Sequence, residues 1–128
     1  MAIDETDKQN LRLAQDGLLT YEYIANHIDN LTKEDLDELV DIMTITDLTG
    51  QFLASAARYL HAIDAAGYAS AINRLVAATI DKDREHRYLA DVLNSLYGPD
   101  YHSRAAELSA TDNNFRRIYK RLYPNSVI

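Results

Sequence analysis

The chain has 128 residues, of which 47% are hydrophobic and 26% charged; it carries a formal net charge of -7 and contains no cysteine. This length and composition predict one globular domain, residues 1–128, with a core that folds without covalent staples. The lack of cysteine excludes a disulfide framework and thiolate metal chemistry. The opening segment, MAIDETDKQNLRL, has no leader pattern and no long apolar run is present, so a cytoplasmic location without membrane association is expected.

Negative charge is concentrated in the first third of the chain. Residues 1–47 hold twelve acids against three bases, whereas residues 48–128 hold eight acids against ten bases. This asymmetry predicts an acidic side on the folded molecule. Such a surface argues against unselective attraction to the phosphate backbone of nucleic acids.

Apolar residues recur at three- and four-residue steps through almost the whole chain, and no segment alternates as a half-buried strand does. Three local signals mark the bounds of the predicted helices. Gly17 is a weak point in the helix predicted up to residue 28, Thr32 is the N-cap of the next helix, and Gly98 ends the helix predicted from residue 83. The predicted helices cover about residues 11–28, 33–43, 49–65, 68–79, 83–97, 101–108 and 113–122. The fold class expected is therefore all-α, a single-domain bundle of six to seven short-to-medium helices.

Two segments resemble each other, LASAARYL at 53–60 and YASAINRLV at 68–76. One interpretation is a helical repeat of the tetratricopeptide kind, which requires a period sustained over three units. The other is that the alanines allow two helices to approach closely. No third copy is present in the sequence, and this favours the second interpretation.

The segment NNFRRIYKRLYP, residues 113–124, predicts a basic amphipathic helix with an apolar stripe on one side. Its basic face has three interpretations. It faces water or the acidic side of the same molecule, it binds nucleic acid with tyrosines stacking on bases, or it engages a protein partner. The candidate interaction surface consists of Arg116, Arg117, Tyr119, Lys120, Arg121 and Tyr123.

An acidic face is predicted on the helix that begins after Thr32. Regularly spaced carboxylates on one surface could imitate DNA and occupy a DNA-binding protein. The candidate acidic face consists of Glu34, Asp35, Asp37, Glu38 and Asp41.

No catalytic or metal-binding motif is present in the sequence. The segment DKDREH, residues 81–86, opens like a calcium loop, but His86 and Val92 stand where an EF-hand needs Gly and Glu. The four histidines fall on separate predicted segments. No enzymatic activity, metal or cofactor is therefore expected. A motif-free enzyme remains the residual class, and Asp83 and His86, the latter predicted near an apolar helix face, are the first places to look.

Nine of the eleven aromatic residues are tyrosines. Tyrosine keeps one polar end, so these side chains predict either an exposed interface patch or a core rim where helices meet. The last three residues, Ser126-Val127-Ile128, also have the short pattern of a PDZ ligand.

The composition and missing motifs favour a non-enzymatic helical protein–protein interaction or regulatory module that binds a protein partner or self-associates. The alternative is a nucleic-acid-directed protein, which either binds through the basic helix or acts as an acidic DNA mimic.

Overall fold

The computed structural model describes residues 3–126, which contain eight α-helices, two short 3₁₀ helices and no strand. The prediction of an all-α fold is confirmed, although the α-helices number eight instead of six to seven. Their bounds are α1 Glu5–Arg12, α2 Leu18–His27, α3 Lys33–Thr46, α4 Gln51–Asp64, α5 Ala69–Lys82, α6 Leu89–Tyr97, α7 Ala105–Thr111 and α8 Asn113–Leu122; the 3₁₀ helices are η1 Ile28–Asn30 and η2 Tyr101–Arg104. The last two residues of the PDZ-ligand pattern lie outside the described residues.

The helix predicted over residues 11–28 is interrupted: α1 ends at Arg12, and α2 begins at Leu18, directly after Gly17. A Cβ atom at Gly17 would lie 2.8 Å from the Cβ atom of Phe52 and 3.0 Å from that of Asp47. The α1–α2 connection therefore packs directly on the α3–α4 connection. This close approach fixes the position of the break.

The helix predicted over residues 83–97 begins later than expected, at Leu89. Residues 83–88 form a connection in which His86 adopts a left-handed φ of 57°. His86 is exposed, so its predicted place near an apolar helix face is wrong. The reason is the side chain of Asp83. Its carboxylate accepts the N–H groups of Tyr88 and Leu89, so residues 83–88 form a turn before α6 and not the first turns of the helix.

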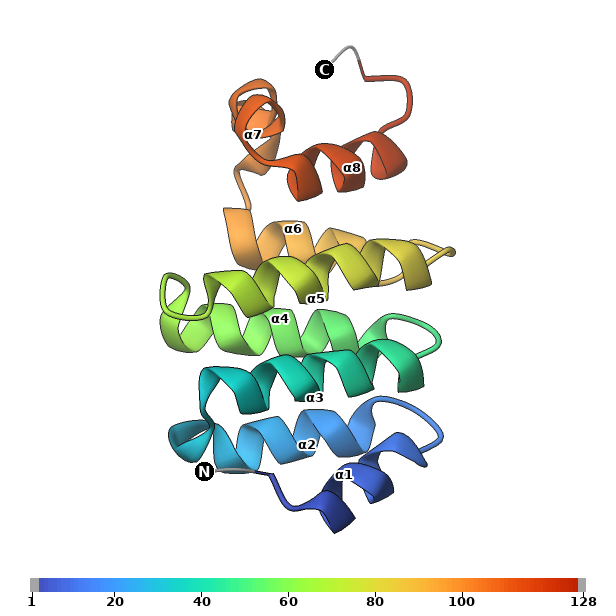
Figure 1. Ribbon diagram of the computed structural model, residues 1–128. Helices are drawn as coiled ribbons and strands as arrows, with labels where there is room; N and C mark the ends of the chain where they lie inside the picture. Colours follow the sequence, from blue (N-terminus) through green and yellow to red (C-terminus); the bar gives the residue numbers. More distant parts are fainter. Residues whose placement is uncertain (1–2, 127–128) are drawn as a thin grey trace.

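The helices are stacked in chain order from α1 at one end to the α7–α8 pair at the other (Figure 1). Each of α2, α3 and α4 contacts the next two helices along the chain, as expected for stacked helical pairs. One cluster of buried side chains extends through the stack from Ile3 to Tyr119. The α1–α2, α3–α4 and α5–α6 connections all lie at the same side of the stack, on the right of Figure 1.

An aspartate holds each of four connections: α1–α2, α3–α4, α5–α6 and α7–α8. Asp16 accepts the N–H of Leu18 at the start of α2, with an N to Oδ1 distance of 2.9 Å. Asp47, Asp83 and Asp112 accept N–H groups at the starts of α4, α6 and α8. The amides at a helix start have no intrahelical partner, so these carboxylates satisfy them and favour the positive end of the dipole.

The two similar segments lie on α4 and α5, which make the most extensive helix–helix contact in the described structure. Ala54, Ala57 and Ala71 are buried there. The close approach of two helices therefore accounts for the shared alanines. None of the helices in residues 3–126 has the length and apolar run needed to cross a bilayer.

Candidate interaction surface

A groove of about 540 Å³ runs between α3 and α5. Val40 and Ile45 from α3 and Ala77 and Ala78 from α5 are the apolar residues that line it. Thr44 also lines it, but its hydroxyl already donates to the carbonyl oxygen of Val40 over 2.8 Å. The α3–α5 groove therefore offers mainly apolar surface between two helices of the stack.

Charges of opposite sign lie at the two ends of this groove. Nearer the start of α3, Arg74 pairs with both Asp37 and Asp41, and its Nη1 atom lies 3.3 Å from Oδ1 of Asp37. Two carboxylates against one guanidinium leave this end negative. At the other end stand Lys82 and, just beyond it in the α5–α6 connection, Arg84. Neither of these cations has a carboxylate partner within residues 3–126. Asp81, which lines the groove beside Lys82, is paired with Arg117 of α8, so this end is positive.

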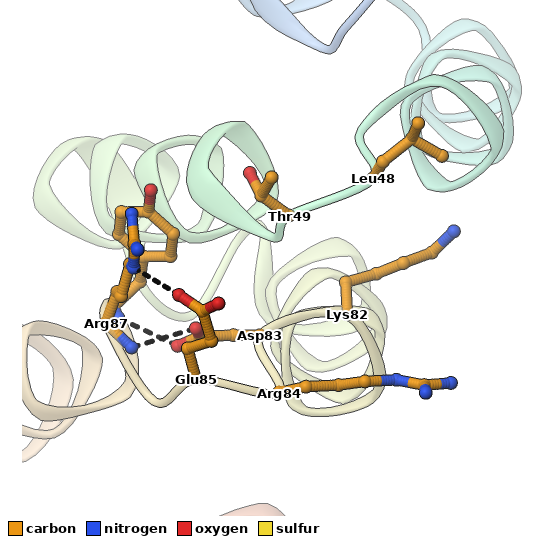
Figure 2. Close-up of a pocket in the computed structure, with 8 residues that line it drawn as sticks. Leu48, Thr49, Lys82, Asp83, Arg84, Glu85 and Arg87 are labelled. Carbon is orange, nitrogen blue, oxygen red and sulfur yellow. Dashed lines mark hydrogen bonds and ion pairs between the residues drawn. The ribbon is translucent and has the colours of Figure 1, made fainter.

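A second depression of about 300 Å³, the loop pocket, adjoins the groove at Lys82 (Figure 2). It lies between the α3–α4 connection, which contributes Leu48, and the α5–α6 connection. Glu85 and Arg87 pair with each other, with an Oε2 to Nε distance of 2.6 Å. Figure 2 shows Lys82 and Arg84 extending away from that pair. The loop pocket therefore combines an exposed leucine with two free cations.

Large aliphatic side chains are exposed around these two depressions. Ile45 is 69% exposed and Leu48 is 70% exposed, and both line a depression. Leu13, at 82%, and Leu18, at 43%, lie at the α1–α2 connection, which packs on the α3–α4 connection. Singly exposed aliphatic residues are ordinary, whereas a group beside a groove is typical of an interaction site.

The basic face of α8 divides into one paired cation and three free ones. Arg117 pairs with Asp81 of α5, with Nη2 lying 3.1 Å from Oδ1. Arg116, Lys120 and Arg121 are exposed and have no carboxylate partner in the described part of the chain. Part of the predicted basic surface is therefore used to hold α8 on α5.

The tyrosines predicted on that surface face the interior. Tyr119 is 7% exposed, and its hydroxyl lies 3.1 Å from Nδ1 of His102. Tyr123 is half-buried, and its hydroxyl lies 2.9 Å from Nε2 of His102 and 2.7 Å from the hydroxyl of Tyr101. Burial and the hydrogen bond with Tyr123 raise the pKa of Tyr101 to about 12. These tyrosines form the rim where η2 and α8 meet.

Asp35, one of the five residues of the predicted acidic face, is only 6% exposed. Its Oδ2 atom accepts the N–H of Thr32 at 3.0 Å, and the Thr32 hydroxyl accepts the N–H of Asp35, which completes a capping box at the start of α3. Burial alone would raise the pKa of Asp35, but the hydrogen bonds from Thr32 outweigh it and the pKa is lowered. Asp35 therefore serves the helix start.

The other carboxylates of the predicted acidic face are mostly paired within the molecule. Glu38 binds Lys8 of α1, with an Oε2 to Nζ distance of 2.7 Å. Asp37 and Asp41 share one arginine of α5. Glu34 is exposed without an ion-pair partner in residues 3–126. The structure thus does not bring these five residues together as an open array of carboxylates.

Four residues that line the groove or the loop pocket were not among the predicted site residues: Ile45, Leu48, Lys82 and Arg84. One signal was available in the sequence. Ile45 lies off the apolar stripe of its helix, which Leu39, Val40 and Met43 help to form. A large aliphatic side chain outside the stripe indicates an exposed position that does not serve the core of its own domain.

Within residues 3–126, no three His, Asp or Glu side chains are placed to hold a metal ion. Asp83, named above as a place to look for an enzyme, is 2% exposed, and its carboxylate accepts three backbone N–H groups. No family model, curated protein or solved structure matches the chain. The described part of the chain is an all-α stack of helices with an apolar groove on one side.

Proposed function

We propose that this chain is a non-enzymatic interaction module that binds a protein partner at the α3–α5 groove and the adjoining loop pocket. The observation that carries the proposal is the exposure of Ile45 and Leu48 beside these two depressions. Apolar surface that a partner covers contributes about 25 cal/mol per Å² to association before the costs of binding are counted. The groove and the loop pocket bring such apolar surface together at one site, where a partner could cover it.

The groove walls are rigid because the helices that form them are anchored in the core. Leu39 and Met43 of α3 and Leu75 of α5 are fully buried in the core cluster. A preformed groove loses little conformational entropy when it is filled. Its form suits an amphipathic helix laid along it, with apolar side chains at helical spacing.

Direct nucleic-acid binding has less support. Only three cations of the basic helix are free, and Tyr119 and Tyr123 are engaged with His102. Acidic mimicry of DNA has less support too, because four of the five proposed carboxylates serve a cap or an ion pair.

Site-specific photo-crosslinking tests the proposal. A photo-reactive residue at position 45, in cells that produce the protein, should give one discrete crosslinked product, which identifies the partner. The purified partner should then bind the Ile45→Asp variant less tightly than the wild-type protein. Position 63 is the control, because Ile63 is exposed too but lies on α4 away from the groove. Absence of a product at position 45, or equal products at both positions, would contradict the proposal.

Fluorescence anisotropy with a mixed-sequence oligonucleotide at low salt tests the alternative. We expect no binding. Binding that disappears when Arg116, Lys120 and Arg121 are changed to Glu would replace our proposal with the nucleic-acid alternative.

A further inference from the structure

The surface around the groove has the two properties that an interface between identical copies needs. It presents a projecting apolar side chain, Ile45, beside an apolar depression floored by the small residues Ala77 and Ala78. It also carries opposite charges at its two ends, Asp41 at one and Lys82 at the other. A surface with both a projection and a recess, and both signs of charge, is complementary to itself.

We propose that the occupant of the α3–α5 groove is a second copy of this chain, related to the first by a two-fold axis. This inference rests on the proposed function of the groove as a protein-binding surface, and it names the partner. Two-fold dimers are the commonest oligomers, and in them the same patch on both copies forms the interface.

The direction of the helices makes the charges match. Both α3 and α5 run the same way along the groove (Figure 1), so the Asp41 end and the Lys82 end lie at opposite ends of it. A two-fold axis across the middle of the groove reverses this direction in the second copy. Asp41 of each copy then faces Lys82 of the other, and the contact occurs twice.

The same operation places the apolar groups together. Ile45 of each copy enters the section of groove that Ala77 and Ala78 floor in the other copy, where short side chains leave room. Two isoleucines that are 69% exposed in the single chain thereby leave water. The arrangement covers the most exposed large aliphatic side chain of the groove without any rearrangement of the helices.

Sedimentation velocity and light scattering on the full chain provide the first test. The expected mass is twice the 14.5 kDa of the single chain, with dissociation on dilution. A chain that stays at 14.5 kDa at every concentration up to about 1 mM would overturn the inference.

Two aspartate variants test the location of the interface. Ile45→Asp should weaken dimerisation by at least about thirtyfold, because it buries a charge at the centre of the interface. Ile63→Asp should leave the dimerisation constant unchanged. The two positions are matched, since each is the last residue but one of its helix, α3 or α4, and each is exposed. A dimer that Ile63→Asp disrupts and Ile45→Asp does not would place self-association elsewhere and overturn the inference.

A charge-exchange experiment tests the two-fold pairing itself. Asp41→Lys and Lys82→Glu should each weaken the homodimer by at least about tenfold, because like charges then face each other twice. Mixing the two variants should restore a dimer, since both contacts in the mixed pair are between opposite charges. A mixture no more dimeric than either variant alone would overturn the pairing, provided that both variants keep the wild-type helical circular dichroism.

The outcome separates this inference from the proposed function. A purely monomeric chain whose position 45 crosslinks to a different protein would overturn the dimer and leave the interaction module standing. A monomeric chain without any crosslink at position 45 would overturn both.

Discussion

Asp47 and Asp83 are 1% and 2% exposed, and a carboxylate so deeply buried requires compensation. The compensation comes from backbone amides. Asp47 accepts the N–H groups of Phe52 and Leu53 over 2.9 and 2.8 Å, and Asp83 accepts those of Tyr88 and two neighbouring residues. Charge-assisted hydrogen bonds to the positive end of a helix make these side chains essential parts of their turns.

Asp83→Ala should lower the free energy of unfolding by about 3 kcal/mol, because it leaves the first amides of α6 unsatisfied in a buried place. Asp83→Asn should lower the free energy of unfolding by less, since the side-chain amide oxygen can still accept a hydrogen bond from one of these N–H groups. Urea denaturation measures both. The matched control is Asp64→Ala, which removes an exposed carboxylate that caps the N–H of Gly67 and should cost less than about 1 kcal/mol. Equal losses at the two positions would contradict the role given to Asp83.

Asp35 predicts a dependence of stability on acid. Its pKa is lowered in the folded chain, so its contribution is fully present above the pKa of the unfolded chain, about 4, and is lost as the pH falls through the lower folded value. Asp35→Asn should destabilise the protein by about 1 kcal/mol at neutral pH, as loss of a cap does. The difference in the free energy of unfolding between the variant and the wild type should then become smaller below about pH 4. Urea denaturation at a series of pH values measures this difference. A difference that is constant with pH would contradict this prediction.

At the scale of the element, α8 closes the end of the stack. Phe115 and Ile118 are fully buried, and α8 contacts both α5 and α6. Asp112 caps the helix, with its Oδ1 atom 3.0 Å from the N atom of Phe115, and its other carboxylate oxygen accepts the hydroxyl of Tyr97 over 2.7 Å. Burial and this hydrogen bond to Asp112 raise the pKa of Tyr97. The position of α8 is therefore held both by its buried apolar side chains and by the Asp112 cap at its start.

Phe115→Ala should lower the free energy of unfolding by about 3 to 5 kcal/mol, the cost of a cavity beneath a fully buried aromatic ring. Arg116→Ala, at the next position and exposed, should change it by less than about 0.5 kcal/mol. Chemical denaturation of the two variants measures the difference. A small loss at Phe115 would mean that α8 is not part of the cooperative core.

How well the elements could be predicted depended on how local their signals are. The apolar stripe of α8 was predicted correctly because all its residues lie within one short segment of the chain. The start of α6 was not, because Asp83 reaches five and six residues ahead to amides that only a particular turn brings near. The break at Gly17 depends on a contact with Phe52, far along the chain, and the sequence indicated only a weak point there.

The candidate surfaces show the same limit. A run of charges could be placed on one helix face from the sequence, but the partner of each charge is set by the tertiary fold. Asp37 and Arg74 meet only because α3 and α5 are adjacent in the stack. The groove likewise lies between two helices that are distant in the sequence. The one sequence signal for it was the position of Ile45 outside the apolar stripe of α3.

At the scale of the molecule, the stack is held by contacts between neighbouring helices, so stability should vary along it. Hydrogen exchange followed by mass spectrometry should find the slowest amides in α4 and α5, which make the most extensive contact, and the fastest in α1, where only Leu11 is buried. In Phe115→Ala, protection should fall most in α6 to α8. Uniform protection from α1 to α8 would contradict a stack and indicate a single cooperative bundle.

A connection held by an aspartate recurs along the chain, at the starts of α2, α4, α6 and α8. Residues 33–68 hold α3 and α4 and lie between α2 and α5 in the stack. A second copy of these residues placed after Tyr68 would have to pack between α4 and α5 instead. Each added pair would bring its own capping aspartate and a further furrow between alternate helices. If the inserted pair folds as the original does, the surface that the protein presents would grow by one helical pair for each copy inserted.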